Sequence, residues 1–205
     1  MFYRPADGHG LPHDPFKALV VPRPIGWISS LDGEGRANLA PYSFFNGCGD
    51  APPLVMFAQT GRKTRTEAEK DSIANIRETR EFACNIVSQA LMDAMNTSSA
   101  QLGREVDEFE AAGLTKAPCA EIAAPRVAEA PASLECRLVR IVDDLPVWKE
   151  HQRNIVVIGE VVGVHIADGA LRDGRVDVVS YTPIARLGYK DYAAVRETFE
   201  LERPG

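Results

Sequence analysis

The sequence predicts one β-rich α+β domain whose strands close into a barrel or stack as a sandwich. Roughly six or seven strand-like segments rich in β-branched and aromatic residues are separated by turn signals. A doubly wound sheet would instead alternate strands and helices regularly. The chain holds neither a Gly-x-Gly-x-x-Gly segment after a strand nor a Gly-x-x-x-x-Gly-Lys-Ser/Thr segment, so both common nucleotide loops are excluded. A length of 205 residues fits a single domain.

The first half of the chain is expected to supply an arm and the first strands. Residues 1–24 carry five prolines, which predicts an extended N-terminal arm. Strands are expected at 25–31 and 36–45, joined by the Asp-Gly turn at 32–35, and a third at 54–58. A helix is expected over 66–80, because Ile73 and Ile76 share one face and charges cover the rest.

The second half is expected to be dominated by long strands. A strand at 81–87 precedes a helix capped by Ser88 that carries Leu91, Met92 and Met95. A short helix at 105–112 is expected to end at Gly113. The Ala/Pro-rich stretch 117–131 reads as a loop, and strands follow at 133–142 and 155–166. The segment 182–205 forms a C-terminal tail of mixed charge.

Composition and charge exclude several classes of protein. The hydrophobic fraction of 45% and charged fraction of 25% are those of a folded globule. No apolar run approaches the length of about 18 residues that spans a bilayer, and the N-terminus lacks a signal-peptide pattern, so we expect a cytoplasmic protein without membrane contact. A net charge of −6 argues against a nucleic-acid partner.

Familiar catalytic and metal-binding patterns are missing from the sequence. The four cysteines form no Cys-x-x-Cys pair, and the histidines stand at no recognised ligand spacing, so no metal site is expected. No Gly-x-Ser-x-Gly elbow is present. We therefore predict no catalytic side chain, and any redox chemistry would come from a cofactor.

The segment 38–46, Asn-Leu-Ala-Pro-Tyr-Ser-Phe-Phe-Asn, is the first candidate for cofactor binding. Pro41 removes a ladder donor, so the strand either lies at a sheet edge or breaks there. Asn38, Ser43 and Asn46 with main-chain groups could then meet the polar edge of a flavin, and Phe44 and Phe45 could cover its apolar side. The alternative is a strand end whose Ser and Asn serve as local caps.

The second candidate is the segment 61–76, which predicts a phosphate site at a helix start. Asp71 or Ser72 could cap this helix, and Lys70 stands just before it. Arg62 and Lys63 lie in the preceding loop, and the positive end of a helix favours a phosphate. The alternative is a solvated helix with ordinary capping. Together, the two segments favour flavin mononucleotide (FMN).

Several ordered motifs resemble those of the flavin reductase-like family of FMN-binding split barrels. The resemblance covers roughly residues 14–200, which would form a single domain with a C-terminal tail. The motifs are Pro-Arg-Pro-Ile-Gly-Trp-Ile-Ser-Ser at 22–30, the segment 38–46, Pro-Pro-Leu-Val-Met-Phe at 52–57, Lys-Asp-Ser-x-x-Asn-Ile at 70–76, Glu-Phe-x-x-Asn-Ile at 81–86, Ile-Gly-Glu-Val at 158–161 and Arg-Leu-Gly-Tyr-Lys-Asp-Tyr at 186–192.

The resemblance implies a six-stranded Greek-key split β-barrel with a few flanking helices. It further implies a homodimer with FMN at or near the subunit interface. An insert at 64–69 leaves open which of Arg62, Lys63 or Lys70 meets the phosphate. By resemblance, the flavin ring and the ribityl chain contact Ser29, Ser30, Asn38, Ala40, Pro41 and Ser43. The resemblance also implies that the phosphate contacts Lys70 and Ser72, together with Arg62. Arg186 and Tyr189 would approach from the partner subunit or close over the flavin.

The function that the resemblance implies is an FMN-dependent NAD(P)H oxidoreductase. NADH or NADPH would pass a hydride to flavin N5, which needs proximity but no protein acid. The electrons would then reach free flavin, oxygen or an oxygenase partner. The first alternative is a split barrel that binds FMN without significant NAD(P)H turnover. A weaker alternative is a haem-binding split barrel.

Overall fold

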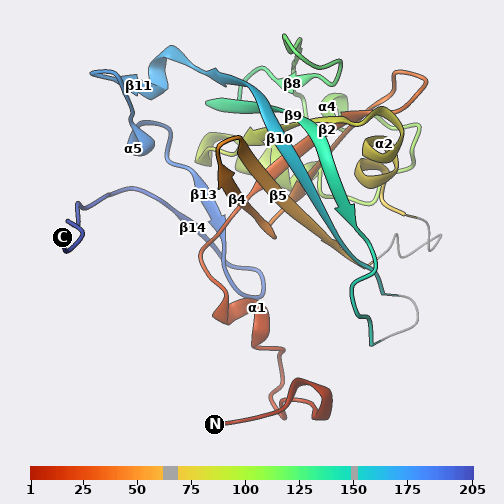
Figure 1. Ribbon diagram of the computed structural model, residues 1–205, viewed down its shortest axis with the longest axis vertical. Helices are drawn as coiled ribbons and strands as arrows, with labels where there is room; N and C mark the ends of the chain where they lie inside the picture. Colours follow the sequence, from red (N-terminus) through yellow and green to blue (C-terminus); the bar gives the residue numbers. More distant parts are fainter. Residues whose placement is uncertain (62–68, 149–151) are drawn as a thin grey trace.

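A seven-stranded antiparallel sheet forms the body of the protein in the computed structural model, which describes residues 1–61, 69–148 and 152–205 (Figure 1). The strands lie in the order β3-β2-β6-β9-β10-β5-β4. Their bounds are β2 (Gly26–Leu31), β3 (Ala37–Tyr42), β4 (Phe45–Asp50), β5 (Pro53–Thr60), β6 (Glu81–Ile86), β9 (Ala132–Val142) and β10 (Asn154–Ile166).

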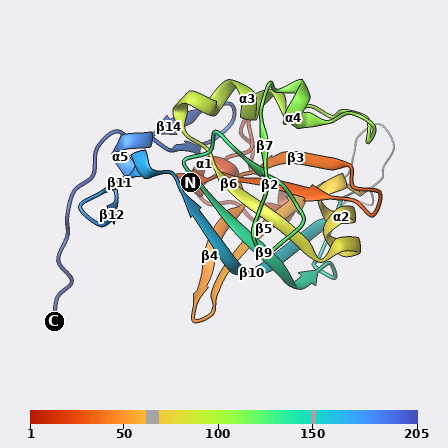
Figure 2. The same cartoon turned by 90° about the horizontal axis from the view of Figure 1, so that it is seen from above.

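The remaining elements are short and flank this sheet, as a view from above shows (Figure 2). Three small sheets pair β1 (Arg23–Pro24) with β13 (Ile184–Arg186) and β14 (Tyr192–Ala194), β7 (Lys116–Ala117) with β8 (Arg126–Val127), and β11 (Leu171–Arg172) with β12 (Arg175–Val176). The helices are η1 (Pro5–Asp7), α1 (Phe16–Leu19), α2 (Asp71–Thr79), η2 (Gln89–Leu91), α3 (Met92–Thr97), α4 (Glu108–Ala111), η3 (Asp168–Ala170) and α5 (Val178–Tyr181). The predicted β-rich fold with a few helices is confirmed.

The large sheet curls until strands distant in its order touch. Tyr42 of β3 and Phe57 of β5 are separated by four intervening strands, yet their ring centroids lie 4.7 Å apart. On β2, a Cβ atom at Gly26 would lie 2.6 Å from Cδ2 of Phe45 on β4, so only glycine admits that ring. The two edge strands, β3 and β4, pair with β2 and β5 but not with each other in the described chain. The result is an open, split barrel.

Both faces of β2 are buried, because period-2 alternation sends its side chains into two separate cores. Ile28 packs inside the curl with Phe57, Phe82 and the Ile73–Ile76 face of α2. Trp27 packs on the outside in a cluster that includes Leu39, Met95 and Phe109, where α3 and α4 cover the sheet. The helix α2 is therefore held against β2 and β3 by this inner core.

Some sequence-predicted boundaries differ from the structure. The expected strand 36–45 ends at Tyr42, and β4, which the sequence analysis did not predict, begins at Phe45. Pro41 does not break β3; it pairs with Trp27 on an edge strand, where a missing N–H is tolerated. The predicted loop 117–131 contains β8 and the end of β7, and the helix expected at 105–112 is confined to Glu108–Ala111.

The helix ends and the N-terminal arm also differ in detail. In the described part of 66–80, α2 begins at Asp71, with Lys70 as its N-cap in place of Asp71 or Ser72. Ser88 precedes the 3-10 turn η2, and its side chain makes no capping hydrogen bond. The expected extended arm, 1–24, includes the short helices η1 and α1 and joins the small sheet through β1. None of the helices in the described ranges is long and apolar enough to cross a membrane.

Candidate functional site

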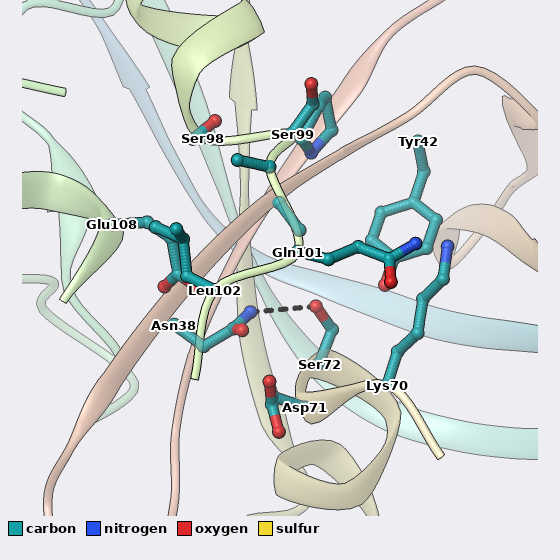
Figure 3. A pocket seen from close by; sticks show the side chains of 13 residues that line it. Asn38, Tyr42, Lys70, Asp71, Ser72, Ser98, Ser99, Gln101, Leu102 and Glu108 are labelled. Carbon is teal, nitrogen blue, oxygen red and sulfur yellow. Dashed lines mark hydrogen bonds between the residues drawn. The ribbon is translucent and has the colours of Figure 1, made fainter. Parts of the chain in front are cut away.

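A pocket of about 130 Å³ lies where the edge strand β3 meets the start of α2 (Figure 3). The segment that follows α3 covers its other side, and α4 contributes one carboxylate. The lining residues are Asn38, Ala40, Pro41 and Tyr42 from β3, Lys70, Asp71 and Ser72 from the helix start, the segment 98–102, and Glu108. Because β3 is an edge strand, its outer side is open to a ligand instead of a neighbouring strand.

A side-chain hydrogen bond joins the strand to the helix at the base of this pocket. The Asn38 amide donates to the Ser72 hydroxyl at 2.8 Å, and both side chains are buried (Figure 3). This bond holds the first turn of α2 in place against β3. A helix start presents backbone N–H groups and the positive end of the helix dipole, which together favour an anion.

Lys70 brings a positive charge to the same place. Its ammonium nitrogen lies 5.5 Å from the centroid of the Tyr42 ring, a cation–π distance. Burial lowers the pKa of Lys70, and the nearby charge of Lys17 lowers it further. A bound anion would reverse this effect because it favours the charged ammonium.

The Tyr42 hydroxyl is buried without a hydrogen-bond partner among the described residues. Tyr42 is only 5% exposed. Burial raises the pKa of this phenol, and the neighbouring Ser72 hydroxyl partly offsets the effect. The phenol therefore stays protonated near neutral pH. This hydroxyl, on a residue that lines the pocket, therefore has a free hydrogen-bonding capacity that a ligand atom or an ordered water can satisfy.

Glu108 gives the pocket an acidic side opposite Lys70. Its carboxylate accepts a hydrogen bond from the Leu39 amide at 3.1 Å. Burial raises the pKa of Glu108, and the charges of Asp71 and Asp107 add to this. The Lys70 ammonium and the Ser72 hydroxyl favour an anionic group at their end of the pocket, and the Asp71 carboxylate between them acts against it. The Glu108 side suits a hydrogen-bond donor.

A second pocket, of about 190 Å³, adjoins the first and shares Pro41 and Ser99 with it. It is lined by Ile25, Pro41, Ser43, Met95, Asn96, Ser99, Arg186 and Tyr192. The Arg186 guanidinium stacks on the Tyr192 ring, 4.5 Å from its centroid, and donates to the Tyr192 hydroxyl and the Tyr189 carbonyl. These contacts fix the orientation of the Arg186 guanidinium at one wall of a mostly apolar pocket.

The structure brings most of the sequence-predicted residues together. Asn38, Ala40, Pro41, Lys70 and Ser72 line the first pocket, and Pro41, Ser43 and Arg186 line the second. Tyr189 is 53% exposed, and its ring packs on His13 instead of lining either pocket. Arg62 and Lys63 lie outside the described residues.

Ser29 and Ser30 lie away from both pockets and already have protein partners. The Ser29 hydroxyl donates to the Pro125 carbonyl at 2.6 Å and accepts from Asn85 at 3.2 Å. Ser30 accepts from Asn75 at 3.2 Å. Both serines are fully buried. Their direct contact with a cofactor stays a prediction that this geometry does not support.

Several lining residues were not among the site residues predicted from the sequence. The segment 98–102 and Glu108 belong to the first pocket, and Asn96 and Tyr192 belong to the second. The run of small and polar residues at 97–101 was the available signal, but only a tertiary contact positions it. The indole of Trp27 donates to the Ser98 hydroxyl at 2.9 Å and ties this segment to β2.

A second group of polar side chains lies on another part of the sheet. Donor atoms of Cys119, Glu135 and His165 lie within 4.8 Å of one another, although no metal site was expected from the sequence. The Glu135 carboxylate is engaged, because it accepts from the amides of Ala120 and Glu121 and contacts His165 at 2.5 Å. These bonds fasten the loop that contains Ala120 and Glu121 to β9.

Comparison with known proteins gives consistent matches over nearly the whole chain. Residues 18–191 match the flavin reductase like domain family. A protein of Aquifex aeolicus with no assigned activity is 40% identical over 175 residues, which is 85% of each chain. The structure of nitrilotriacetate monooxygenase component B from Bacillus cereus is similar, with a TM-score of 0.86, 32% identity and 98% of each chain covered. That of 2-nitrobenzoate 2-nitroreductase from Pseudomonas fluorescens has a TM-score of 0.79 and 31% identity, covering 92% of this chain and 88% of that one.

Proposed function

Because this chain belongs to the flavin reductase-like family, we propose that it is an FMN-dependent oxidoreductase reduced by NADH or NADPH. Membership of this family supports a flavin cofactor and flavin-related redox chemistry. The choice of FMN and of a nicotinamide reductant is our proposal. It rests on the shape and chemistry of the two adjoining pockets.

One observation carries the proposal: two pockets of different character meet at Pro41 and Ser99. One end of the first pocket is formed by the start of α2 with the Lys70 ammonium and the Ser72 hydroxyl, which suits a phosphate. The second is mostly apolar and has one preset guanidinium, which suits a flat ring with polar edges. A ligand with a phosphate at one end and a heterocycle at the other matches this order.

The side chains that line the two pockets suit FMN by their chemistry. Lys70 and Ser72 would hold the phosphate, and Asn38, Ala40 and Pro41 would run beside the ribityl chain. The orphaned hydroxyl of Tyr42 would gain a partner from the ligand. Ser43 and Arg186 would meet the ring. Bound FMN would supply the redox chemistry by taking up a hydride equivalent and passing on its electrons.

The protein's part in such a reaction is binding and orientation. Rigid placement of the two reactants side by side replaces a protein acid or base. The Arg186 guanidinium, fixed by Tyr192, would set the electrostatics at the ring end. The segment 98–102, tied to Trp27 through Ser98, would exclude water from one side of the pocket.

Possible electron acceptors are free flavin, oxygen or an oxygenase partner. The similarity to a component B of nitrilotriacetate monooxygenase supports an oxygenase partner for this chain as well. We further propose a homodimer, in which the partner copy would approach the flavin. The cytoplasmic location and the absence of a nucleic-acid partner stay predictions from the sequence.

The experiment that tests the proposal is the spectrum and reducibility of the purified protein. Reconstitution with FMN should give one flavin per chain with the two visible absorption bands of an oxidised flavin. Anaerobic stopped-flow mixing with NADH or NADPH should bleach those bands. A yellow protein that neither nucleotide bleaches would make the chain an FMN-binding protein without reductase activity. A haem Soret band in place of flavin absorption would reject both readings.

A further inference from the structure

We propose that the N-terminal arm forms part of the cofactor site, with Lys17 of α1 supplying a second positive charge beside Lys70 for the FMN phosphate. The inference rests on the proposed function and deepens it. The sequence predicts an extended arm over 1–24 that overlaps the start of the domain, and no motif points to Lys17. Its placement emerges only from the packing of the arm.

Arg23 holds the arm against the body of the protein. Arg23 as a whole residue is 6% exposed, and its guanidinium donates to three carbonyl groups, those of Lys17, Val20 at 2.6 Å and Leu187 at 2.7 Å. One side chain thus ties the main chain around α1 to the C-terminal element. Close packing supports the same junction, because a Cβ atom at Gly188 would lie 2.5 Å from Cβ of Ala18. The main chain at Lys17 is therefore fixed, although its side chain is exposed.

The Lys17 ammonium is directed toward the same stretch of chain as the Lys70 ammonium. Lys17 Nζ lies 6.0 Å from the centroid of the Phe44 ring, and Lys70 Nζ lies 5.5 Å from that of Tyr42. Phe44 and Tyr42 flank Ser43, just where β3 ends. Two lysine ammonium groups therefore lie over aromatic rings that are two residues apart in the chain, and Lys70 of these two lysines lines the first pocket.

The two ammonium groups repel each other. The charge of Lys17 lowers the pKa of Lys70 beyond the effect of burial. Within the described ranges, the ion pairs formed by lysine and arginine include neither Lys17 nor Lys70. Like charges held near each other are unfavourable unless an anion lies near both. A phosphate monoester, which carries a charge of about −1.5 to −2 near neutral pH, would relieve the repulsion.

The test compares FMN with riboflavin, which has the same ring and ribityl chain but no phosphate. Dissociation constants for both ligands are measured by quenching of flavin fluorescence in the full chain and in Lys17→Ala, Lys17→Arg and Arg175→Ala. Arg175 is exposed on β12 and controls for the loss of one positive charge elsewhere on the protein. Thermal melts of the apo-proteins confirm that each variant is folded.

We expect Lys17→Ala to weaken FMN binding about tenfold, the typical loss of one charge-assisted hydrogen bond. Riboflavin affinity should stay within about twofold, since no phosphate contact is lost. Lys17→Arg should keep most of the FMN affinity, and Arg175→Ala should match the unaltered protein. The FMN affinity of Lys17→Ala should also depend less on salt than that of the unaltered protein.

Other outcomes overturn the inference in distinguishable ways. If Lys17→Ala binds FMN as tightly as the unaltered protein, Lys17 does not meet the phosphate, yet the proposed function stands. If Lys17→Ala weakens the binding of FMN and of riboflavin equally, the arm affects binding of the flavin ring or the stability of the fold. That result also rejects a contact between Lys17 and the phosphate. If the unaltered protein binds no FMN, the proposed function itself fails, and the inference falls with it.

Discussion

Replacement of Tyr42 by phenylalanine should have opposite effects on stability and on cofactor binding. The Tyr42 hydroxyl is buried without a partner among the described residues. An unsatisfied buried polar group costs roughly 1–3 kcal/mol, and the phenyl ring keeps the same shape without that cost. We therefore expect Tyr42→Phe to raise the free energy of unfolding of the apo-protein by about 1–2 kcal/mol. The melting temperature would rise by roughly 2–4 °C for each kcal/mol in a chain of this length.

The same variant should bind FMN less tightly, because the hydroxyl is proposed to find its partner on the ligand. Loss of one hydrogen bond worth about 1 kcal/mol lowers the affinity roughly fivefold. Urea unfolding of the apo-protein and fluorescence titration with FMN measure the two effects separately. The matched control is Tyr3→Phe in the N-terminal arm, where the Tyr3 ring packs on His9. This variant should change neither the free energy of unfolding nor the FMN affinity. A less stable apo-protein, or unchanged FMN affinity, would refute the reasoning.

Two further predictions concern ionisable groups near the site. Burial alone would raise the pKa of Asp32, but hydrogen bonds from Arg36, Glu34 and Arg104 outweigh it and lower the pKa to about 2. Asp32→Asn should lower the free energy of unfolding by about 1–2 kcal/mol at pH 7, as measured by urea unfolding. Because the folded-state pKa of Asp32 is depressed, the difference between the two proteins should shrink as the pH falls from about 4 toward 2. A difference that does not depend on pH would contradict the assignment. Because the pKa of Lys70 is lowered, the ratio of FMN to riboflavin affinity should fall with rising pH before the value of a free lysine, about 10.4, is reached. In Lys70→Arg, whose guanidinium does not titrate there, this ratio should stay flat, and a parallel decline in both proteins would exclude Lys70 as the cause.

The strands of the fold were predictable because their signals are local. The Asp-Gly turn at 32–33 between two apolar runs indicated the hairpin of β2 and β3, which the structure confirms. The strand β4 was missed because Gly47 and Gly49 have low β-propensity, and pairing with β5 overrides it. In the described part of the helix expected at 66–80, Glu69 and Lys70 lie outside α2, because charged residues fit either a helix face or a loop.

The candidate site was predictable only in part, because tertiary contacts assemble it. Asn38 and Ser72 were singled out separately, and the hydrogen bond between them shows that they belong to one site. Ser29 illustrates the opposite case: alternation along a strand cannot tell a ligand-facing residue from a buried one when both faces are covered. Lys17 carried no sequence signal, since its position depends on Arg23 and the C-terminal element.

A crystal structure of the protein grown with FMN would show directly whether the cofactor occupies the two adjoining pockets. We predict that the phosphate contacts Lys70 and the Ser72 hydroxyl, and that the ring lies beside Pro41 and Ser43 with Arg186 at its edge. A different cavity, of about 600 Å³ and lined in part by Ser88 and Thr182, offers FMN another place. Density for FMN there, or a phosphate that touches neither Lys70 nor Ser72, would contradict the account.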